Sequence, residues 1–358
     1  MTSCVIWPEH SACSHDPHTA TCPTKATIPS STLSLKQTAP RPVSHSMLPR
    51  ARTLLTSALN HLSTTARTMS TTFTHPDSQI PITLPSETET SPTLTQQELL
   101  AFPAFKTWHA TLLRSLALQH TIPTHPFHAS PYALKSIAIT GVDRFGHNPS
   151  RLGFVKLRAD VRNTADETLP GVALLRGGSV GMLVVLTVRG GGGAGMFRKG
   201  ARDEEYALLT VQARVAAGSM AFAELPAGML DAAGSFAGAA AAEMEEECGL
   251  RVREEEMVDL TGLVWEAEGE GEGEGLQRAV YTSPGGQDEF VPLMLVRRDV
   301  SKEDMEAMKG KLTGLRDEGE KITLKVVRLA DVWKEAGRDA KALSAIAIYE
   351  GLKREGRL

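Results

Sequence analysis

Three glutamates near the end of a predicted helix are the residues best suited to chemistry. Glu243, Glu246 and Glu247 follow an alanine run at 239–242 with the spacing i, i+3 and i+4. In an α-helix this spacing puts the carboxylates on one face, within reach of one another. The like charges repel, and the negative end of the helix dipole adds to the repulsion. A hard cation such as Mg²⁺ would remove this penalty, whereas the alternative is an ordinary acidic, solvated helix end.

The residues around the glutamates predict how they are positioned. Pro226 and Gly228 predict a turn. Ser235 is suited to the N-cap of the following helix. Gly249 is suited to the C′ position, where a left-handed conformation ends a helix. The sequence therefore predicts a turn followed by a helix that carries the glutamates in its last turns.

The chain from residue 96 onward alternates helical and strand-like patterns. An apolar face of helical spacing runs from Gln96 to Gln119 and is broken early by Pro103. Later elements are expected as strand-like alternation at 133–159, a buried strand at 180–188, strands near 291–296 and 322–329, and a helix near 339–355. Interleaved strands and helices predict the α/β or α+β class.

Residues 1–95 have a different composition. Ser and Thr account for 34 of them, and Pro is frequent, which predicts disorder. No Asp or Glu occurs between residues 17 and 76, while Lys and Arg do, and leucines recur at helical spacing after Met47. This pattern is typical of an organelle transit peptide, with a solvated low-complexity tail as the alternative. We therefore expect a cytoplasmic or mitochondrial location.

The overall composition excludes several classes of protein. Lys plus Arg is 38 and Asp plus Glu is 42, giving a net charge of −4. That balance argues against a nucleic-acid partner, and no apolar run is long enough to span a membrane. The few cysteines form no disulfide framework, so a reducing compartment is expected. The spacing of Cys4, Cys13 and Cys22 matches no usual zinc motif.

The spacing around the glutamates resembles the signature of the Nudix hydrolase family. Gly228 opens it, Glu243 follows at the family's distance, Glu246 and Glu247 form its acidic pair, and Gly249 closes it. Other segments resemble the ADP-sugar diphosphatase branch of that family, namely 141–146, 176–180, 224–230, 283–289 and 315–320. The resemblance covers about residues 97–358. It implies a Nudix α/β/α sandwich with a mixed sheet at 176–358, after a small N-terminal helix and β subdomain at 96–175 and the disordered leader at 1–95.

Two signature positions depart from the family. Gly234 stands where the family has its first Glu, and Ala242 stands where it has Arg. That Arg normally helps to hold the glutamates by charge-assisted hydrogen bonds. We expect weaker metal binding or slower turnover as a result.

The resemblance also implies the reaction. It is the hydrolysis of the diphosphate in an ADP-sugar, ADP-ribose or ADP-glucose, to AMP and a sugar phosphate, with Mg²⁺ or alternatively Mn²⁺. The implied metal ligands are the backbone carbonyl of Ala227 and the side chains of Glu243, Glu246 and Glu247. Glu246 is expected to act partly through water and to take part in catalysis.

The remaining roles fall on two other segments. Glu289, on a loop after Ser283–Gly286, is the implied general base, with Asp288 beside it and Glu320 in reserve. The implied substrate-binding residues are Gln212, Arg214 and Gly286. Trp265 is expected in the core or at a dimer contact.

The branch is typically a homodimer, so a second copy is the expected protein partner and a nucleotide sugar the expected small-molecule partner. Two other functions remain open. One is a Nudix enzyme for another nucleoside diphosphate derivative. The other is a weakly active or inactive module that binds a nucleotide sugar, which the substitutions at 234 and 242 favour.

Overall fold

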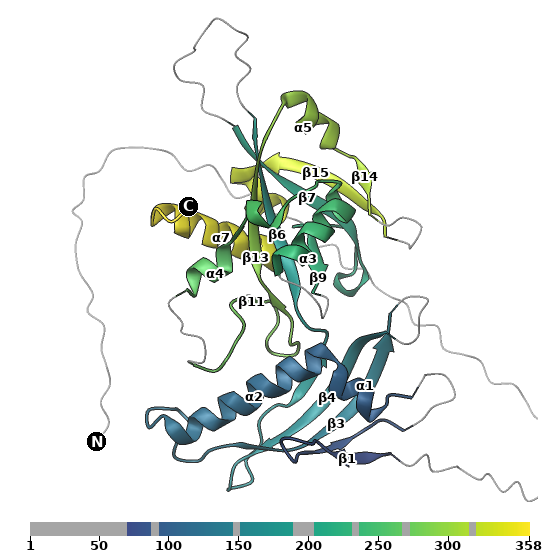
Figure 1. Ribbon diagram of the computed structural model, residues 1–358, viewed down its shortest axis with the longest axis vertical. Coiled ribbons are helices and arrows are strands. Elements are labelled where there is room, and N and C mark those ends of the chain that lie inside the picture. The colour runs from purple at the N-terminus through teal and green to yellow at the C-terminus, as the bar shows by residue number, and fades with distance from the viewer. Residues whose placement is uncertain are drawn as a thin grey trace, which may run out of the picture. The chain divides into compact units, whose positions relative to one another are not determined.

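The computed structural model describes residues 70–86, 93–145, 151–188, 204–230, 236–266, 273–314 and 320–358. All of them belong to the unit Thr65–Leu358, which is compact by itself and distinct from Met1–Thr64. Its strands and helices interleave, so the expected mixed α/β class is confirmed (Figure 1). The expected leader helix after Met47 and the family position at Gly234 lie outside the described residues.

The first sheet has five strands in the order β1-β2-β3-β4-β5. They are β1 (Thr72–Thr74), β2 (Pro81–Thr83), β3 (Ala133–Arg144), β4 (Leu152–Arg162) and β5 (Val172–Leu175). Two helices, α1 (Gln96–Ala101) and α2 (Pro103–Thr121), share a buried apolar cluster with these strands. Thr95 and Glu98 form a capping box that starts α1, and Pro103 occupies the first turn of α2, where its missing N–H costs nothing.

Strands β1 and β2 lie in a stretch that the sequence analysis assigned to the disordered leader. Phe73 pairs with Ile82, and Ile82 is fully buried in the same cluster as Leu99 of α1. Two short strands give too few alternating residues to stand out in a Ser/Thr-rich background. The folded part of the chain therefore begins before residue 95, and the stretch expected to be disordered includes these strands.

The second sheet has eight strands, with the path β10-β13-β6-β7-β15-β14 and with β8 and β9 attached to β7 and β6. Its members are β6 (Ser179–Val188), β7 (Glu204–Arg214), β8 (Ser219–Glu224), β9 (Ala227–Met229), β10 (Met257–Asp259), β13 (Leu293–Val300), β14 (Leu312–Thr313) and β15 (Ile322–Arg328). Strands β6 and β13 are parallel, and the other pairs are antiparallel, so the sheet is mixed. A separate hairpin joins β11 (Val280–Tyr281) to β12 (Phe290–Val291).

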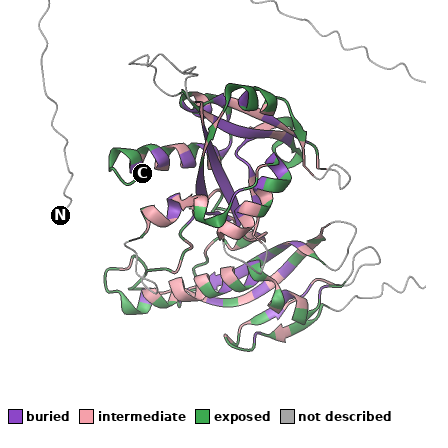
Figure 2. Ribbon diagram, turned by 45° about the horizontal axis from the view of Figure 1, so that its top comes forward, coloured by how far each residue is buried: buried purple, intermediate pink, exposed green. Residues whose placement is uncertain are grey.

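Helices cover both faces of the second sheet. Those described are α3 (Phe236–Glu243), α4 (Leu260–Val264), α5 (Lys302–Met308), α6 (Val332–Glu335) and α7 (Ala340–Arg354). Because side chains alternate along a strand, Leu183 and Val185 pack into the cluster that contains α7, whereas Met182 and Val184 pack into the one that contains α3. Strand β6 is buried on both faces (Figure 2), as expected for the middle layer of an α/β/α sandwich.

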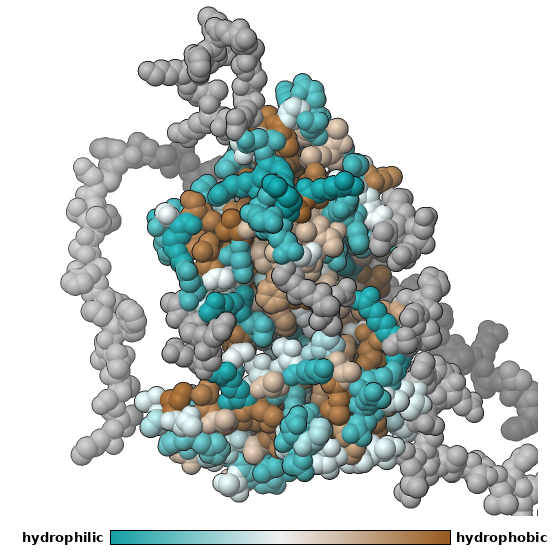
Figure 3. Space-filling model, viewed as in Figure 1, coloured by the Kyte–Doolittle hydropathy of each residue, from teal (hydrophilic) through white to brown (hydrophobic). Residues whose placement is uncertain are grey.

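The surface mixes polar and apolar side chains. In Figure 3, hydrophilic and apolar residues are interspersed over the face in view. Of the large apolar residues in the described ranges, Val215 and Met220, which flank the turn between β7 and β8, are the most exposed at 80% and 79%. No described helix is long and apolar enough to cross a membrane.

Candidate functional site

A split in the second sheet forms the base of the site. Strands β6 and β7 pair with each other from Val184 and Leu208 toward one end. Toward the other end they separate, and β9 pairs with β6 while β8 pairs with β7. The short crossing Leu225–Pro226 between β8 and β9 therefore lies at the split. It leads into the Ala227–Gly228 segment that faces the glutamates.

The glutamates lie where the helix changes its winding. Helix α3 ends at Glu243, and a π-helical turn runs from Met244 to Cys248. Gly249 then adopts φ 66°, as its expected role at the helix end requires. A π turn is wider than an α turn because its hydrogen bonds reach one residue further. The prediction of an α-helix through Cys248 was therefore correct in position but missed the change of winding.

Glu247 is the buried member of the three, with 2% of its surface exposed. Its Oε2 accepts the backbone N–H of Ala227 at 3.1 Å, and its Oε1 accepts a longer bond from Gln212 Nε2 at 3.4 Å. Burial, followed by repulsion from Glu243, raises the pKa of Glu247 to about 8. The Ala227 N–H opposes this shift. Glu247 is thus a carboxylate whose negative charge is poorly compensated by the protein.

Glu243 lies close enough to Glu247 to repel it and directly faces Gly228. A Cβ placed on Gly228 would be 1.8 Å from the Glu243 carboxyl carbon. Gly228 therefore allows this close approach of the Glu243 carboxylate, in addition to any role in the turn. Glu320, held in reserve as a base, also raises the pKa of Glu247 by repulsion. Together with Glu224, which repels it as well, carboxylates from three separate segments act on the buried Glu247.

The third predicted glutamate does not share this position. Glu246 is exposed, whereas Glu247 is buried, because the π turn rotates residue 246 away from the face that holds 243 and 247. No three His, Cys, Asp or Glu side chains of the described residues form a preassembled metal cluster. Ala227 contacts Glu247 through its backbone N–H.

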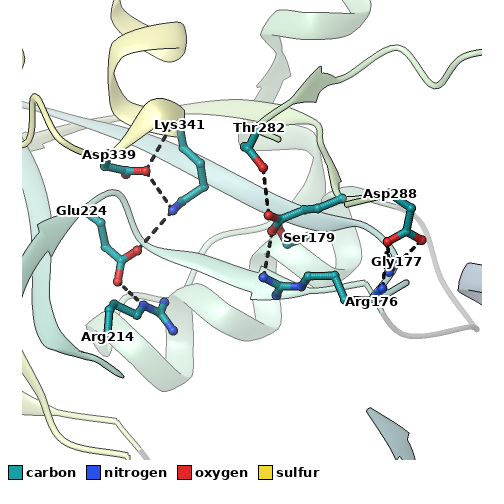
Figure 4. Close-up of polar contacts among 10 residues, drawn as sticks. Arg176, Gly177, Ser179, Arg214, Glu224, Thr282, Asp288, Asp339 and Lys341 are labelled. Atoms are coloured by element: carbon teal, nitrogen blue, oxygen red, sulfur yellow. Dashed lines mark hydrogen bonds and ion pairs between the residues drawn. The ribbon is translucent and has the colours of Figure 1, made fainter. Parts of the chain in front are cut away.

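Glu289, the proposed general base, has both oxygens occupied. Oε1 lies 3.0 Å from Arg176 Nη1 and accepts the Ser179 hydroxyl at 3.0 Å. Oε2 accepts the Thr282 hydroxyl at 2.9 Å. Asp288 accepts the backbone N–H groups of Arg176 and Gly177 (Figure 4). In this conformation Glu289 is a fixed member of a hydrogen-bond network that joins the β11–β12 loop to the start of β6.

The expected substrate-side residues separate into two places. Gln212 contacts Glu247, and Arg214 lies two residues further along β7, beyond an irregularity in the pairing of β7 with β8. Arg214 Nε donates to Glu224 Oε1 at 2.7 Å. Gly286 instead accepts the backbone N–H of Leu174 at 2.9 Å, which ties its loop to the first sheet.

Two residues that the sequence analysis overlooked complete this group. Lys341 Nζ lies 3.1 Å from Glu224 Oε2 and 2.9 Å from Asp339 Oδ1. Arg214, Glu224, Lys341 and Asp339 thus form a row of alternating charge (Figure 4). The pairing of Lys341 with Glu224 joins positions 117 residues apart, so no local pattern could have revealed it.

Two cavities adjoin these segments. One of about 530 Å³ is lined by residues that include Arg176, Gly178 and Leu230, together with the aromatic rings of Phe145 and Phe290. A second of about 670 Å³ lies along α2 and the Pro284–Asp288 loop and is mainly apolar. The first combines an arginine with aromatic surfaces beside the segment that leads to the glutamates.

Comparison with known proteins places these features in context. The chain is 38% identical over 225 residues to "Nudix hydrolase 14, chloroplastic" of Arabidopsis thaliana, a match that covers 62% of this chain and 64% of that protein. The chain thus spans less than two thirds of that relative's length. No family model matches the chain. The sequence similarity supports a relationship to the Nudix hydrolases.

A solved structure described as "Crystal structure of ADP compounds hydrolase" superposes with a TM-score of 0.36 at 14% identity, covering 63% of this chain and 99% of that one.

Proposed function

We propose that this protein is a Nudix hydrolase that cleaves the diphosphate of an ADP-sugar, ADP-ribose or ADP-glucose, to AMP and a sugar phosphate. The observation that carries the proposal is the buried Glu247, set beside Glu243 and bound by Ala227 and Gln212. The similarity to Nudix hydrolase 14 supports the same family. The ADP-sugar preference rests on the resemblance of the segments outside the signature.

The residues at this site fit a hard divalent cation by charge. Glu243 and Glu320 both repel the buried carboxylate of Glu247, and a dication would turn this repulsion into attraction. Glu243 and Glu247 would hold Mg²⁺ or Mn²⁺, with the exposed Glu246 contributing through water and the Ala227 carbonyl as a further ligand. The metal supplies charge neutralisation at the diphosphate and activation of water.

The chain's own residues bind and orient the substrate in this proposal. Arg214 is 43% exposed at its side chain and is fixed by Glu224, so its guanidinium can meet a phosphate without a large loss of freedom. Gln212 holds the Glu247 carboxylate. Either Glu320 or Glu289 accepts the proton from water. Because Glu289 is held by Arg176, Ser179 and Thr282 in this conformation, its use as a base requires the loop at 283–289, with Gly286, to move.

A substrate panel tests the proposal. Purified protein is incubated with ADP-ribose, ADP-glucose or NADH, each with Mg²⁺, Mn²⁺ or a chelator, and AMP release is measured. We expect metal-dependent release from an ADP-sugar. Preference for NADH would instead support a Nudix enzyme for another nucleoside diphosphate derivative, and no turnover of any substrate would refute the enzymatic proposal.

A binding module for a nucleotide sugar is the second candidate, and one observation favours it. Ala242 is exposed and carries no charge, so it cannot hold the glutamates as the family's Arg does. Calorimetry with ADP-ribose separates the two functions, since a sensor binds the nucleotide sugar and releases no AMP. Restoring the family's arginine with Ala242→Arg should increase turnover if the protein is an enzyme and should leave a sensor inactive.

We also propose that the acid-poor segment before residue 70 directs the protein to an organelle, as the word "chloroplastic" in the relative's name suggests for that relative. Fluorescent fusions of the full chain and of a chain starting at residue 70 test this. Equal distribution of both fusions would contradict it.

A further inference from the structure

The start of helix α7 contacts the sheet at its split. Asp339, the N-cap residue of α7, is 4% exposed and accepts the backbone N–H of Leu225 at 3.0 Å. Lys341 places its ammonium between Asp339 and Glu224, and its aliphatic stem passes 3.7 Å from where a Cβ of Gly181 would lie. Two charged residues of the last helix therefore anchor the crossing from β8 to β9.

That crossing leads directly into the candidate metal site. Two residues after Leu225, the N–H of Ala227 binds Glu247, and Gly228 packs against Glu243. A shift of Leu225 would therefore move the backbone that contacts both glutamates. The anchor at α7 acts on the site through the chain, without touching it.

The same anchor fixes Arg214 through Glu224. The Glu224 side chain is 3% exposed and is shared between Lys341 and Arg214, whose side chain is 43% exposed. The row contains two acids and two bases, so it is neutral as a whole. Of its members, Arg214 is the one open to a ligand.

We propose that Lys341 and Asp339 are positioning residues of the hydrolase site, holding Arg214 and the Ala227–Gly228 segment in the arrangement that receives the diphosphate. This inference rests on the proposed function. Without the Lys341 charge, Glu224 and Asp339 share one remaining cation, and Glu224 draws the Arg214 guanidinium to itself. A buried carboxylate left without its partner is costly, so the crossing shifts to relieve it. Arg214 then becomes less available to the substrate, and the site gains one negative charge.

The test compares Lys341→Met, which keeps the length and removes the charge, with Lys341→Arg, which keeps the charge. Lys334→Met is the matched control, because Lys334 is an exposed lysine of α6 that pairs with Asp331 just before the helix. kcat and KM for ADP-ribose are measured separately, together with Tm. We expect Lys341→Met to raise KM about tenfold or more with a smaller effect on kcat, Lys341→Arg to restore most of it, and Lys334→Met to behave as wild type.

A double-mutant cycle distinguishes positioning from a purely structural role. If Lys341 acts through Arg214, then Lys341→Met has much less effect on KM in an Arg214→Gln background. Additive effects on KM, or a lowered Tm with unchanged KM and kcat, would overturn the inference.

Should Lys341→Met fail to fold, the charge-balanced pair Lys341→Met with Asp339→Asn replaces it in the same cycle, with the same expected and contradicting results. A wild-type protein that neither turns over nor binds ADP-ribose or ADP-glucose would overturn the proposed function and this inference together. An active wild type with kinetically silent variants would overturn this inference alone.

Discussion

The carboxylate of Glu243 lies against the bare Cα of Gly228, so close that a methyl group there would fall 1.8 Å from its carboxyl carbon. The obstructed atom is the far end of a flexible side chain, so the fold can yield at little cost. The position of the carboxylate cannot yield without changing the candidate metal site. A substitution at Gly228 should therefore affect the candidate metal site much more than the stability of the fold.

Gly228→Ala is expected to lower metal-dependent AMP release by about 100-fold, since a displacement near 1 Å at a reacting group has costs of that order. Its Tm should change little. Gly141→Ala is the control, because a Cβ there meets only Lys156 Cβ at an ordinary 3.7 Å. Steady-state kinetics and thermal melts of both variants provide the measurement. Equal activity in the two variants would show that the position of Glu243 does not matter.

Glu246 and Glu247 are neighbours with opposite environments, and their variants should differ accordingly. Glu247→Gln removes the buried charge and should abolish metal-dependent turnover. Glu246→Gln changes an exposed residue and should cost about tenfold, the low end of the range for a group that acts through another ligand. Calorimetric titration with Mn²⁺ should show the same order for metal affinity. A larger loss of turnover in Glu246→Gln than in Glu247→Gln would contradict the site geometry.

The raised pKa of Glu247 predicts how stability and metal binding depend on pH. Unfolded, the carboxyl titrates near 4.5; folded and metal-free, its pKa is about 8. Between pH 4.5 and about 8, the Glu247 carboxyl is ionised in the unfolded state but remains protonated in the folded state. The free energy of unfolding should therefore fall as pH rises from 4.5 to about 8, by up to about 1.4 kcal/mol per pH unit from this group.

Denaturant unfolding of metal-free protein across this range measures the effect, and Glu247→Gln should remove it. Mg²⁺ favours the charged form of Glu247, so its binding should release a proton at pH 7 and tighten as pH rises. Calorimetry in buffers of different ionisation enthalpy detects the proton. A flat stability profile, identical in the Gln variant, would mean that the pKa is not raised.

Local pattern was enough to predict the elements that carry the site. The apolar run at 180–188 became β6, and the helix expected near 339–355 became α7, bounded by the Asp339 N-cap. Both depend on residues close together in the sequence. Strands β1 and β2, at 72–83, were missed because their alternation of apolar and polar residues is too short to be distinguished from the polar sequence around them.

The site itself could be predicted only in part. Glu243 and Glu247 lie together as their spacing indicates, whereas the π turn turns Glu246 outward, and a change of winding leaves no clear mark in a run of strong helix formers. The environment of Glu289 and the Lys341–Glu224 pair depend on segments more than a hundred residues apart. Such pairings follow from the sheet topology, which a single sequence does not specify.

His109, a buried residue of helix α2, predicts a second pH dependence of opposite sign. It is 5% exposed, stacks on Phe105 with ring centroids 5.5 Å apart, and lies 4.4 Å from the His75 ring. Burial, with repulsion from His75, lowers the pKa of His109 from 6.5 to about 4. The contribution of His109 to the free energy of unfolding is therefore fully present above pH 6.5 and is lost as pH falls toward 4.

We expect acidification over this range to cost on the order of 2–3 kcal/mol at this site, because the unfolded state takes up a proton that the folded state resists. His109→Phe keeps an aromatic ring against Phe105 and cannot be protonated. Denaturant unfolding should therefore show a smaller loss between pH 6.5 and 4 in the variant than in wild type. Equal losses would mean that His109 is not the group whose protonation destabilises the fold.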